Sequence, residues 1–153
     1  MTEALLEGGP AGGPLGNVLE VGTGCGYQTA ILARLAEEVY TVERVASLVA
    51  KARKNLRALK VNNVRIKHGD GSAALGEELE VDGILVTAAA TQVPTALLSH
   101  LTTGGRMVLP LARHDEDGKG GVQLLTVIDK TPGGIREQTF DAVRFVPLLS
   151  GLA

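Results

Sequence analysis

The stretch Val18-Leu-Glu-Val-Gly-Thr-Gly-Cys-Gly26 carries the strongest structural signal in the sequence. Its first residues, together with Asn17, form a short apolar run that predicts a buried strand. The three glycines that follow allow the backbone to turn tightly and to pass close to a ligand. From Tyr27 to Leu35 the apolar residues recur at helical spacing. The sequence therefore predicts a strand, a glycine loop and a helix in direct succession.

Strands and helices continue to alternate on both sides of this stretch. Residues 1–7 are expected to be the end of a helix, and residues 8–16, rich in glycine and proline, to be a loop. A second loop is expected over residues 113–121. Helices are predicted over residues 45–59 and 95–101, the second closed by Gly104-Gly105. Further strands are predicted over residues 39–43, 64–68, 82–87, 106–111, 122–128 and 142–146.

These elements predict an α/β fold in one domain over residues 1–153. Because most of the strands are continuous apolar runs, they favour a mostly parallel sheet with helices on both faces. No helix pattern lies between the last two strands. They are therefore expected to pair antiparallel at one edge.

Composition excludes several classes of protein. The chain has 15 Lys and Arg against 17 Asp and Glu and a net charge of −2, so it lacks the basic balance of a nucleic-acid-binding domain. No apolar run approaches the ~20 residues of a membrane helix, and no signal peptide is evident. The single cysteine excludes an internal disulfide, and His100 and His114 have no partners at metal-ligand spacing. We expect a soluble, cytoplasmic protein with no metal, membrane partner or nucleic-acid partner.

Polar and glycine residues gather at four predicted strand ends. They are the glycine loop Gly22–Gly26, Glu43, Asp70 and Thr87. Ligands of open α/β sheets bind beyond the carboxyl ends of the strands, near the point where strand order reverses. We therefore expect one binding rim, in which the Glu43 carboxylate accepts both hydroxyls of a ribose. The alternative is that the glycines only make a tight turn and Glu43 caps the following helix.

The glycine loop differs from two common phosphate-binding patterns. The dinucleotide pattern G-x-G-x-x-G would require a glycine where Tyr27 stands, and no Gly-Lys-Ser/Thr of a P-loop follows. The spacing E-x-G-x-G-x-G that begins at Glu20 instead suits a ligand without a pyrophosphate.

Several segments resemble the protein-L-isoaspartate O-methyltransferase family of class I S-adenosylmethionine-dependent methyltransferases. The segments are 18–33, 39–44, 68–71, 82–90, 104–110 and 143–149. Gly26-Tyr-Gln-Thr-Ala30 and Arg144-Phe-Val-Pro-Leu148 are the most family-specific runs. The resemblance extends from residue 17 to the C-terminus and implies a Rossmann-like fold, with a mostly parallel twisted sheet and an antiparallel edge.

The resemblance also implies a reaction and its site. S-adenosyl-L-methionine would give its methyl group to the α-carboxyl of L-isoaspartyl residues in damaged proteins or peptides, leaving S-adenosyl-L-homocysteine, as a step of protein repair. The implied cofactor-binding residues are Gly22, Thr23, Gly24, Cys25, Gly26, Glu43, Arg44, Asp70, Gly71 and Thr87. The implied substrate-binding residues are Ala88, Val146, Pro147, Leu148 and Leu149.

The family pattern includes a helical segment ahead of the first strand. It carries a Gly-Gln-Thr-Ile-Ser-type motif whose serine contributes to the active site, and no such motif precedes residue 17 here. We therefore assign no catalytic residue and expect an N-terminally shortened member. Two alternatives to an active repair enzyme are a catalytically weak or inactive cofactor-binding core and a methyltransferase for another carboxylate or small molecule.

Overall fold

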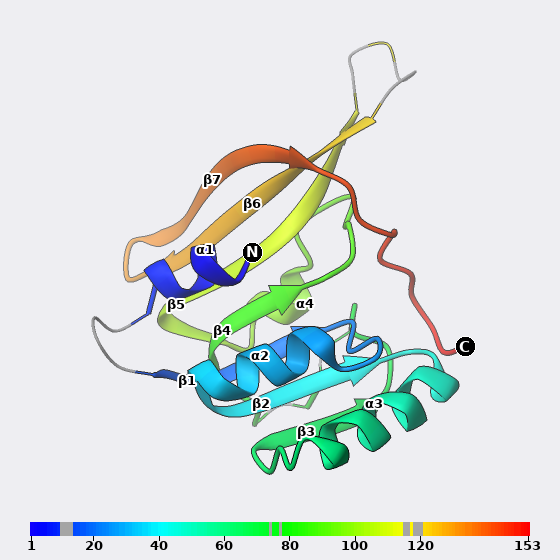
Figure 1. Cartoon of the computed structure of the whole chain (residues 1–153). Helices are drawn as coiled ribbons and strands as arrows, with labels where there is room; N and C mark the ends of the chain where they lie inside the picture. Colours follow the sequence, from blue (N-terminus) through cyan, green and yellow to red (C-terminus); the bar gives the residue numbers. More distant parts are fainter. Residues whose placement is uncertain (10–13, 74, 77, 115–116, 118–120) are drawn as a thin grey trace.

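The computed structural model describes residues 1–9, 14–73, 75–76, 78–114, 117 and 121–153. Within them, seven strands form one sheet in the order β3-β2-β1-β4-β5-β6-β7 (Figure 1). The strands are β1 (Leu15–Val21), β2 (Ala36–Glu43), β3 (Val64–His68), β4 (Val81–Val86), β5 (Leu101–His114), β6 (Gly121–Thr131) and β7 (Gly134–Val143). The helices are α1 (Thr2–Glu7), α2 (Tyr27–Leu35), α3 (Ala46–Ala58) and α4 (Thr95–Leu98).

The sheet is parallel from β3 to β5, and β6 and β7 add antiparallel pairs at one edge. This confirms the predicted α/β class and the mostly parallel sheet with an antiparallel edge. Strand order reverses between β1 and β4, because the chain continues from β1 to β2 on one side and from β4 to β5 on the other. The carboxyl ends of β1 and β4 therefore flank the place where such sheets bind ligands.

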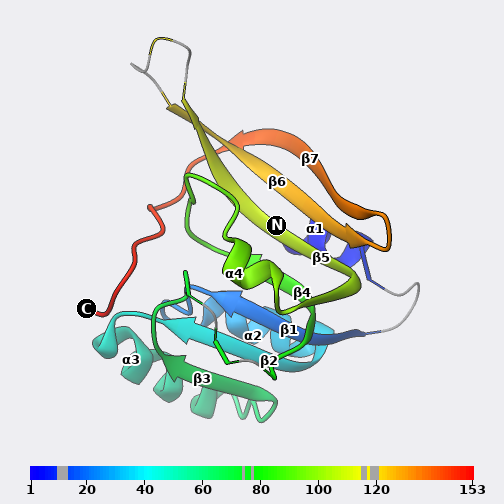
Figure 2. The ribbon, with the colours of Figure 1, turned by 180° about the vertical axis from the view of Figure 1, so that it is seen from behind.

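Helices cover both faces of the sheet. α1, α2 and α3 lie on one face and α4 on the other, as Figures 1 and 2 show from opposite sides. Leu5 of α1 and Leu32 of α2 belong to one apolar core cluster with Val18, whereas Leu97 of α4 belongs to a second cluster with Leu19. Neighbouring residues of a strand point to opposite faces, so β1 is buried on both sides. That burial explains its continuous apolar run.

The predicted helix over residues 95–101 is wrong in its length and in its end. α4 is a single turn, and β5 already begins at Leu101, so Gly104-Gly105 lies inside a strand. A Cβ at Gly105 would lie 2.7 Å from the Leu101 side chain and 2.9 Å from the Asp82 carbonyl oxygen. The glycine is therefore required by close packing at an irregularity in the β4–β5 pairing, and not by a helix end.

The predicted last strand over residues 142–146 is also wrong. β7 starts at Gly134 and ends at Val143, and residues 144–146 lie outside it. β7 lies at the edge of the sheet and is exposed for nearly its whole length, so its sequence contains no apolar run. A strand of this kind leaves only a weak pattern in a sequence.

The N-terminal helix prediction is confirmed by α1. Of the two predicted loops, residues 10–13 of the first and residues 115–116 and 118–120 of the second lie outside the described residues. The first loop is also shorter than predicted, because β1 begins at Leu15.

Candidate functional site

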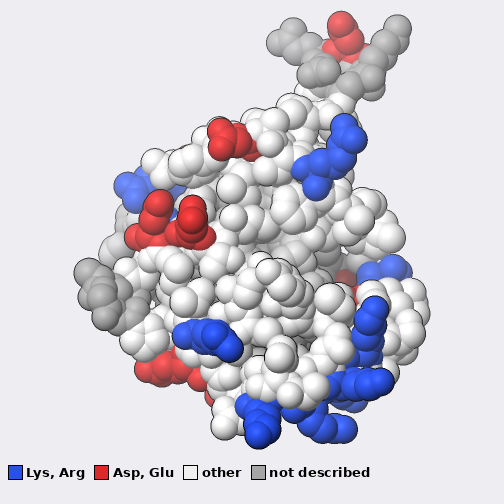
Figure 3. All heavy atoms as spheres, in the orientation of Figure 1, with Lys and Arg blue, Asp and Glu red and all other residues white. Residues whose placement is uncertain are grey.

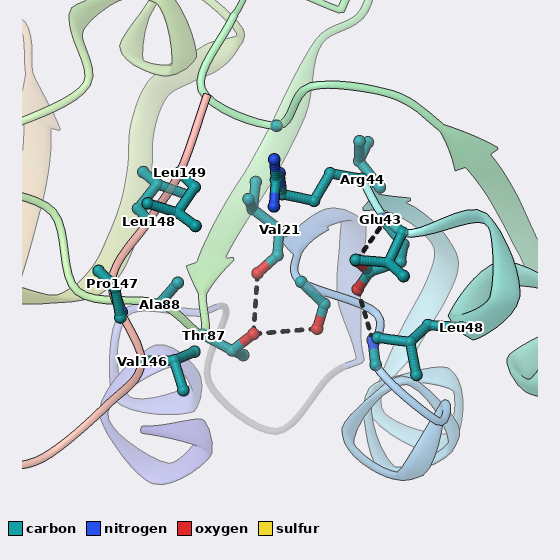
Figure 4. Close-up of a pocket in the computed structure, with 15 residues that line it drawn as sticks. Val21, Glu43, Arg44, Leu48, Thr87, Ala88, Val146, Pro147, Leu148 and Leu149 are labelled. Carbon is teal, nitrogen blue, oxygen red and sulfur yellow. Dashed lines mark hydrogen bonds between the residues drawn. The ribbon is translucent and has the colours of Figure 1, made fainter. Parts of the chain in front are cut away.

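A cleft of about 400 Å³ opens at the carboxyl ends of β1, β2 and β4, with residues after β7 forming one of its walls (Figure 4). The predicted site residues that line it are Gly22, Gly24, Glu43, Arg44, Gly71, Thr87, Ala88, Val146, Pro147, Leu148 and Leu149. Thr23, Cys25, Gly26 and Asp70 are not among its lining residues. The structure therefore brings most of the predicted rim into one cleft.

The loop between β1 and α2 requires glycine at three positions. Gly22, Gly24 and Gly26 have φ angles of 98°, 56° and 90°, which residues with a Cβ rarely adopt. A Cβ at Gly22 would lie 2.3 Å from the Thr87 hydroxyl oxygen, whereas one at Gly24 would meet no atom within 4 Å. Gly22 therefore lets β1 and β4 approach each other. Gly24 leaves open space that lets a ligand reach the loop backbone.

Glu43 connects the glycine loop to the start of α3. Its side chain is buried, and one carboxylate oxygen accepts a hydrogen bond from the Gly24 N–H at 2.9 Å. The other accepts one from the N–H of Val45, the N-cap residue of α3, at 3.0 Å. Glu43 thus lines the cleft at the end of β2 and also has part of the capping role that the sequence left as the alternative.

Thr87 joins the end of β4 to the end of β1. Its hydroxyl lies 2.9 Å from the carbonyl oxygens of both Val21 and Gly22, which share its single proton (Figure 4). Gly71, which follows β3, approaches the same strand, because a Cβ there would lie 2.4 Å from the Val21 side chain. These two contacts hold the chain after β3 and the chain after β4 against the end of β1, beside the cleft.

Four residues assigned to the cofactor from the sequence have other surroundings. The Thr23 hydroxyl lies 2.6 Å from the Thr41 hydroxyl, Gly26 is the N-cap of α2, and Cys25 is exposed. The fourth, Asp70, accepts hydrogen bonds from the Gly151 N–H at 2.7 Å and from Ser72. These bonds, that from Gly151 foremost, lower the pKa of Asp70 below its usual range.

Glu20 is a candidate that the sequence-based assignment left out. Its side chain is fully buried in β1, and one carboxylate oxygen accepts hydrogen bonds from the Thr29 and Thr41 hydroxyls. The other oxygen has no partner among the described residues. Because Thr41 also contacts Thr23, a chain of hydroxyls links Glu20 to the glycine loop. Burial raises the pKa of Glu20 to about 7, against the effect of the two hydroxyls and with a smaller contribution from Glu43.

The part of the chain that the structure describes contains neither a metal cluster nor a membrane helix. No group of three or more His, Cys, Asp or Glu side chains there is placed to hold a metal ion. None of the described helices is long and apolar enough to cross a bilayer.

The parallel sheet, the glycine loop after β1 and the acid at the end of β2 define a Rossmann-like class I S-adenosylmethionine-dependent methyltransferase fold. Within this class, the chain belongs to the protein-L-isoaspartate(D-aspartate) O-methyltransferase (PCMT) family, whose model matches residues 13–153.

Curated relatives carry the same family name. The chain is 48% identical to the protein-L-isoaspartate O-methyltransferase of Methylobacillus flagellatus, over 99% of this chain and 65% of that protein. It is 50% identical to the enzyme of Dechloromonas aromatica, again over 99% of this chain and 65% of that protein. The chain thus spans about two thirds of the length of the curated relatives that it matches.

Solved structures of the family share the fold. A Plasmodium falciparum protein named as a protein-L-isoaspartate O-methyltransferase, in complex with S-adenosyl-L-homocysteine, has a TM-score of 0.74 and 27% identity, over 90% of this chain and 67% of that chain. A second structure with this name has a TM-score of 0.79 and 26% identity, over 92% of this chain and 44% of that chain.

Proposed function

We propose that the protein transfers a methyl group from S-adenosyl-L-methionine to the α-carboxyl of L-isoaspartyl residues in damaged proteins or peptides. The observation that carries the proposal is the convergence of Glu43, the open face of Gly24 and the apolar segment 146–149 on one cleft. Family membership and the ligand of the Plasmodium falciparum structure support it.

The residues of the cleft fit this cofactor. Each Glu43 oxygen accepts one backbone N–H, and a carboxylate oxygen has two acceptor positions, so both retain capacity for a ribose hydroxyl. Val42, Leu48 and Leu149 supply apolar walls of the kind that an adenine ring requires. A volume of about 400 Å³ lies within the usual range of small-molecule sites, roughly 300 to 1,000 Å³.

The reaction places few demands on catalytic side chains. When bound, the cofactor supplies a methyl group activated by a sulfonium. The nucleophile is the isoaspartyl carboxylate, which has a reference pKa of roughly 4 and is ionised at neutral pH without a general base. Its oxygen forms a bond to the methyl carbon while the carbon–sulfur bond breaks, giving a methyl ester and S-adenosyl-L-homocysteine.

The chain's own residues position the two reactants and keep water out of the cleft. The glycine loop, Glu43 and Thr87 would hold the cofactor, and Arg44 and Asp70 would complete the predicted rim through their contacts with Gly151. Ala88 and residues 146–149 would form the apolar side against which the isoaspartyl peptide lies, excluding water from the transfer. The proposal also keeps the cytoplasmic location and the protein substrates, without nucleic acid, that the sequence predicts.

Calorimetric titration with S-adenosyl-L-homocysteine tests the cofactor site. We expect binding by the wild-type chain and a loss of affinity on the order of a hundredfold in Glu43→Ala, because this removes charge-assisted acceptors for two ribose hydroxyls. Glu37→Ala, at an exposed position of β2, is the matched control and should bind normally. Binding that is indifferent to Glu43→Ala would contradict the site.

Methyl transfer from labelled cofactor tests the substrate. An L-isoaspartyl peptide should be labelled, and the same peptide with an ordinary aspartyl residue should not. Cofactor binding without transfer would favour the binding-core alternative. Labelling of unrelated carboxylates in preference to the isoaspartyl peptide would favour the second alternative.

A further inference from the structure

The segment after β7, residues 144–153, runs along the carboxyl edge of the sheet from β7 to the start of α3 (Figure 1). It pairs with the chain after β4, because the Ala89 N–H donates to the Val146 carbonyl at 2.7 Å and the Leu148 N–H donates to the Ala89 carbonyl at 2.8 Å. Residues 146–149, two of which make these contacts, line the cleft. Whatever fixes the end of this segment therefore fixes one wall of the cleft.

Two side chains hold the end of the segment at a single residue. The Gly151 N–H donates to the Asp70 carboxylate at 2.7 Å, and the Gly151 carbonyl accepts from Arg44 Nε at 3.0 Å. Arg44 also lies 3.4 Å from the Ser150 carbonyl oxygen. Gly151 has a φ angle of 79°, in the left-handed region that favours glycine. The N–H and the carbonyl of Gly151 are thus held by Asp70, which follows β3, and by Arg44, which follows β2.

Backbone pairing continues beyond this residue. The Ala153 N–H donates to the Arg44 carbonyl at 2.9 Å, and the Ala46 N–H donates to the Ala153 carbonyl at 3.1 Å. The segment is therefore attached at both ends of the stretch that lines the cleft. One attachment is to the chain after β4 and the other is to the chain between β2 and α3, on which Glu43 also lies.

We propose that Arg44 and Asp70 are positioning residues, which grip Gly151 and thereby hold residues 146–149 as a wall that retains the cofactor and orients the isoaspartyl peptide. The proposal rests on the proposed function. It assigns both side chains a role through the segment, in place of direct contact with the cofactor. Asp70, whose carboxylate is already engaged by Gly151 and Ser72, is outside the cleft lining, whereas Arg44 lines the cleft and its guanidinium donates to the segment.

Gly151→Ala tests the grip without removing either side chain. A Cβ at Gly151 would meet no atom within 4 Å, so the substitution acts through the left-handed backbone alone. We expect S-adenosyl-L-homocysteine to dissociate about tenfold faster, because an alanine disfavours this conformation and so lowers the fraction of molecules in which the segment is held. Gly104→Ala is the matched control, because Gly104 has a φ angle of 91°, has equally open space and lies in β5 away from the cleft.

Arg44→Ala, alone and combined with Gly151→Ala, distinguishes positioning from direct binding. If Arg44 acts through its hold on Gly151, the double variant should release the ligand no faster than the faster of the two single variants, within about twofold. Amide hydrogen exchange of the ligand-free chain gives a readout independent of activity. Exchange at Gly151 and Leu148 should accelerate in both single variants, while the thermal midpoint of unfolding stays that of the Gly104→Ala control.

The outcomes separate the two proposals. Failure of the wild-type chain to bind the ligand would overturn the proposed function and the inference with it. Normal wild-type binding, with release and exchange unchanged in Gly151→Ala, would overturn the inference alone. Strictly additive effects of Arg44→Ala and Gly151→Ala would also overturn it, because they would indicate that Arg44 acts on the ligand directly.

Discussion

Glu20→Gln should change how the stability of the protein depends on pH. The buried Glu20 carboxyl has its pKa raised from an ordinary 4.5 to about 7, chiefly by burial. Between these two values the folded protein holds a proton that the unfolded chain has released, so stability is fully present below pH 4.5 and falls as pH rises to about 7. Because one unit of pKa corresponds to about 1.4 kcal/mol, ionisation of Glu20 should cost the folded state about 3 kcal/mol.

The amide of Glu20→Gln keeps an acceptor oxygen for Thr29 and Thr41 but cannot ionise. The free energy of unfolding of this variant, minus that of the wild type, should therefore rise by about 3 kcal/mol between pH 4.5 and pH 7.5. Urea unfolding followed by circular dichroism measures it, since the chain has no tryptophan. Glu37→Gln, at an exposed position, should show no such rise. A difference that stays constant across this range would refute the reasoning.

Three further substitutions test the fold and the loop. Arg106→Met should destabilise the protein by about 2 kcal/mol in urea unfolding, because the mostly buried Asp129 carboxylate loses its two hydrogen bonds from Arg106, at 2.6 and 2.9 Å, and keeps one from Arg136, at 3.3 Å. Gly22→Ala should weaken S-adenosyl-L-homocysteine binding on the order of tenfold or more in calorimetry, because its Cβ would lie 2.3 Å from the Thr87 hydroxyl at a φ angle of 98°. Cys25→Ser should leave that affinity within about twofold, since Cys25 is exposed, and a larger loss would give its side chain a direct role.

The parallel half of the fold could be predicted because burial on both faces forces its strands to be apolar. Val18 and Leu19 show this, since they enter different core clusters. The edge strand β7 could not be predicted, because exposure on both sides removes that constraint. Gly104-Gly105 predicted a wrong helix end for a related reason. A glycine pair marks a close approach of backbones as readily as it marks a helix end, and only the neighbouring strand distinguishes the two.

The rim of the cleft could be predicted because parallel strands bring their carboxyl ends to one edge. This rule alone was enough to predict that Glu43 and Thr87 line the cleft. The contact between Asp70 and Gly151 depends on the path of the chain after β7, over a separation of 81 residues, and no local pattern encodes that path. Glu20 was visible as an acid inside an apolar strand, a placement that is costly unless the group is hydrogen-bonded or neutral. That cost is the feature of the sequence that could have identified Glu20 as a candidate.

Two glutamates support the glycine loop from different environments, and this difference decides what each carboxyl group must supply. Glu43 accepts the Gly24 N–H at the cleft, where its remaining acceptor positions can serve a ligand. Glu20 acts from the interior through Thr41 and Thr23, and its hydrogen bonds require only one acceptor oxygen. An amide at position 20 would satisfy those hydroxyls, whereas an amide at position 43 would replace one acceptor oxygen by a donor beside a backbone N–H. The loop therefore depends on charge only at its outer support, and its inner support depends on hydrogen-bond geometry.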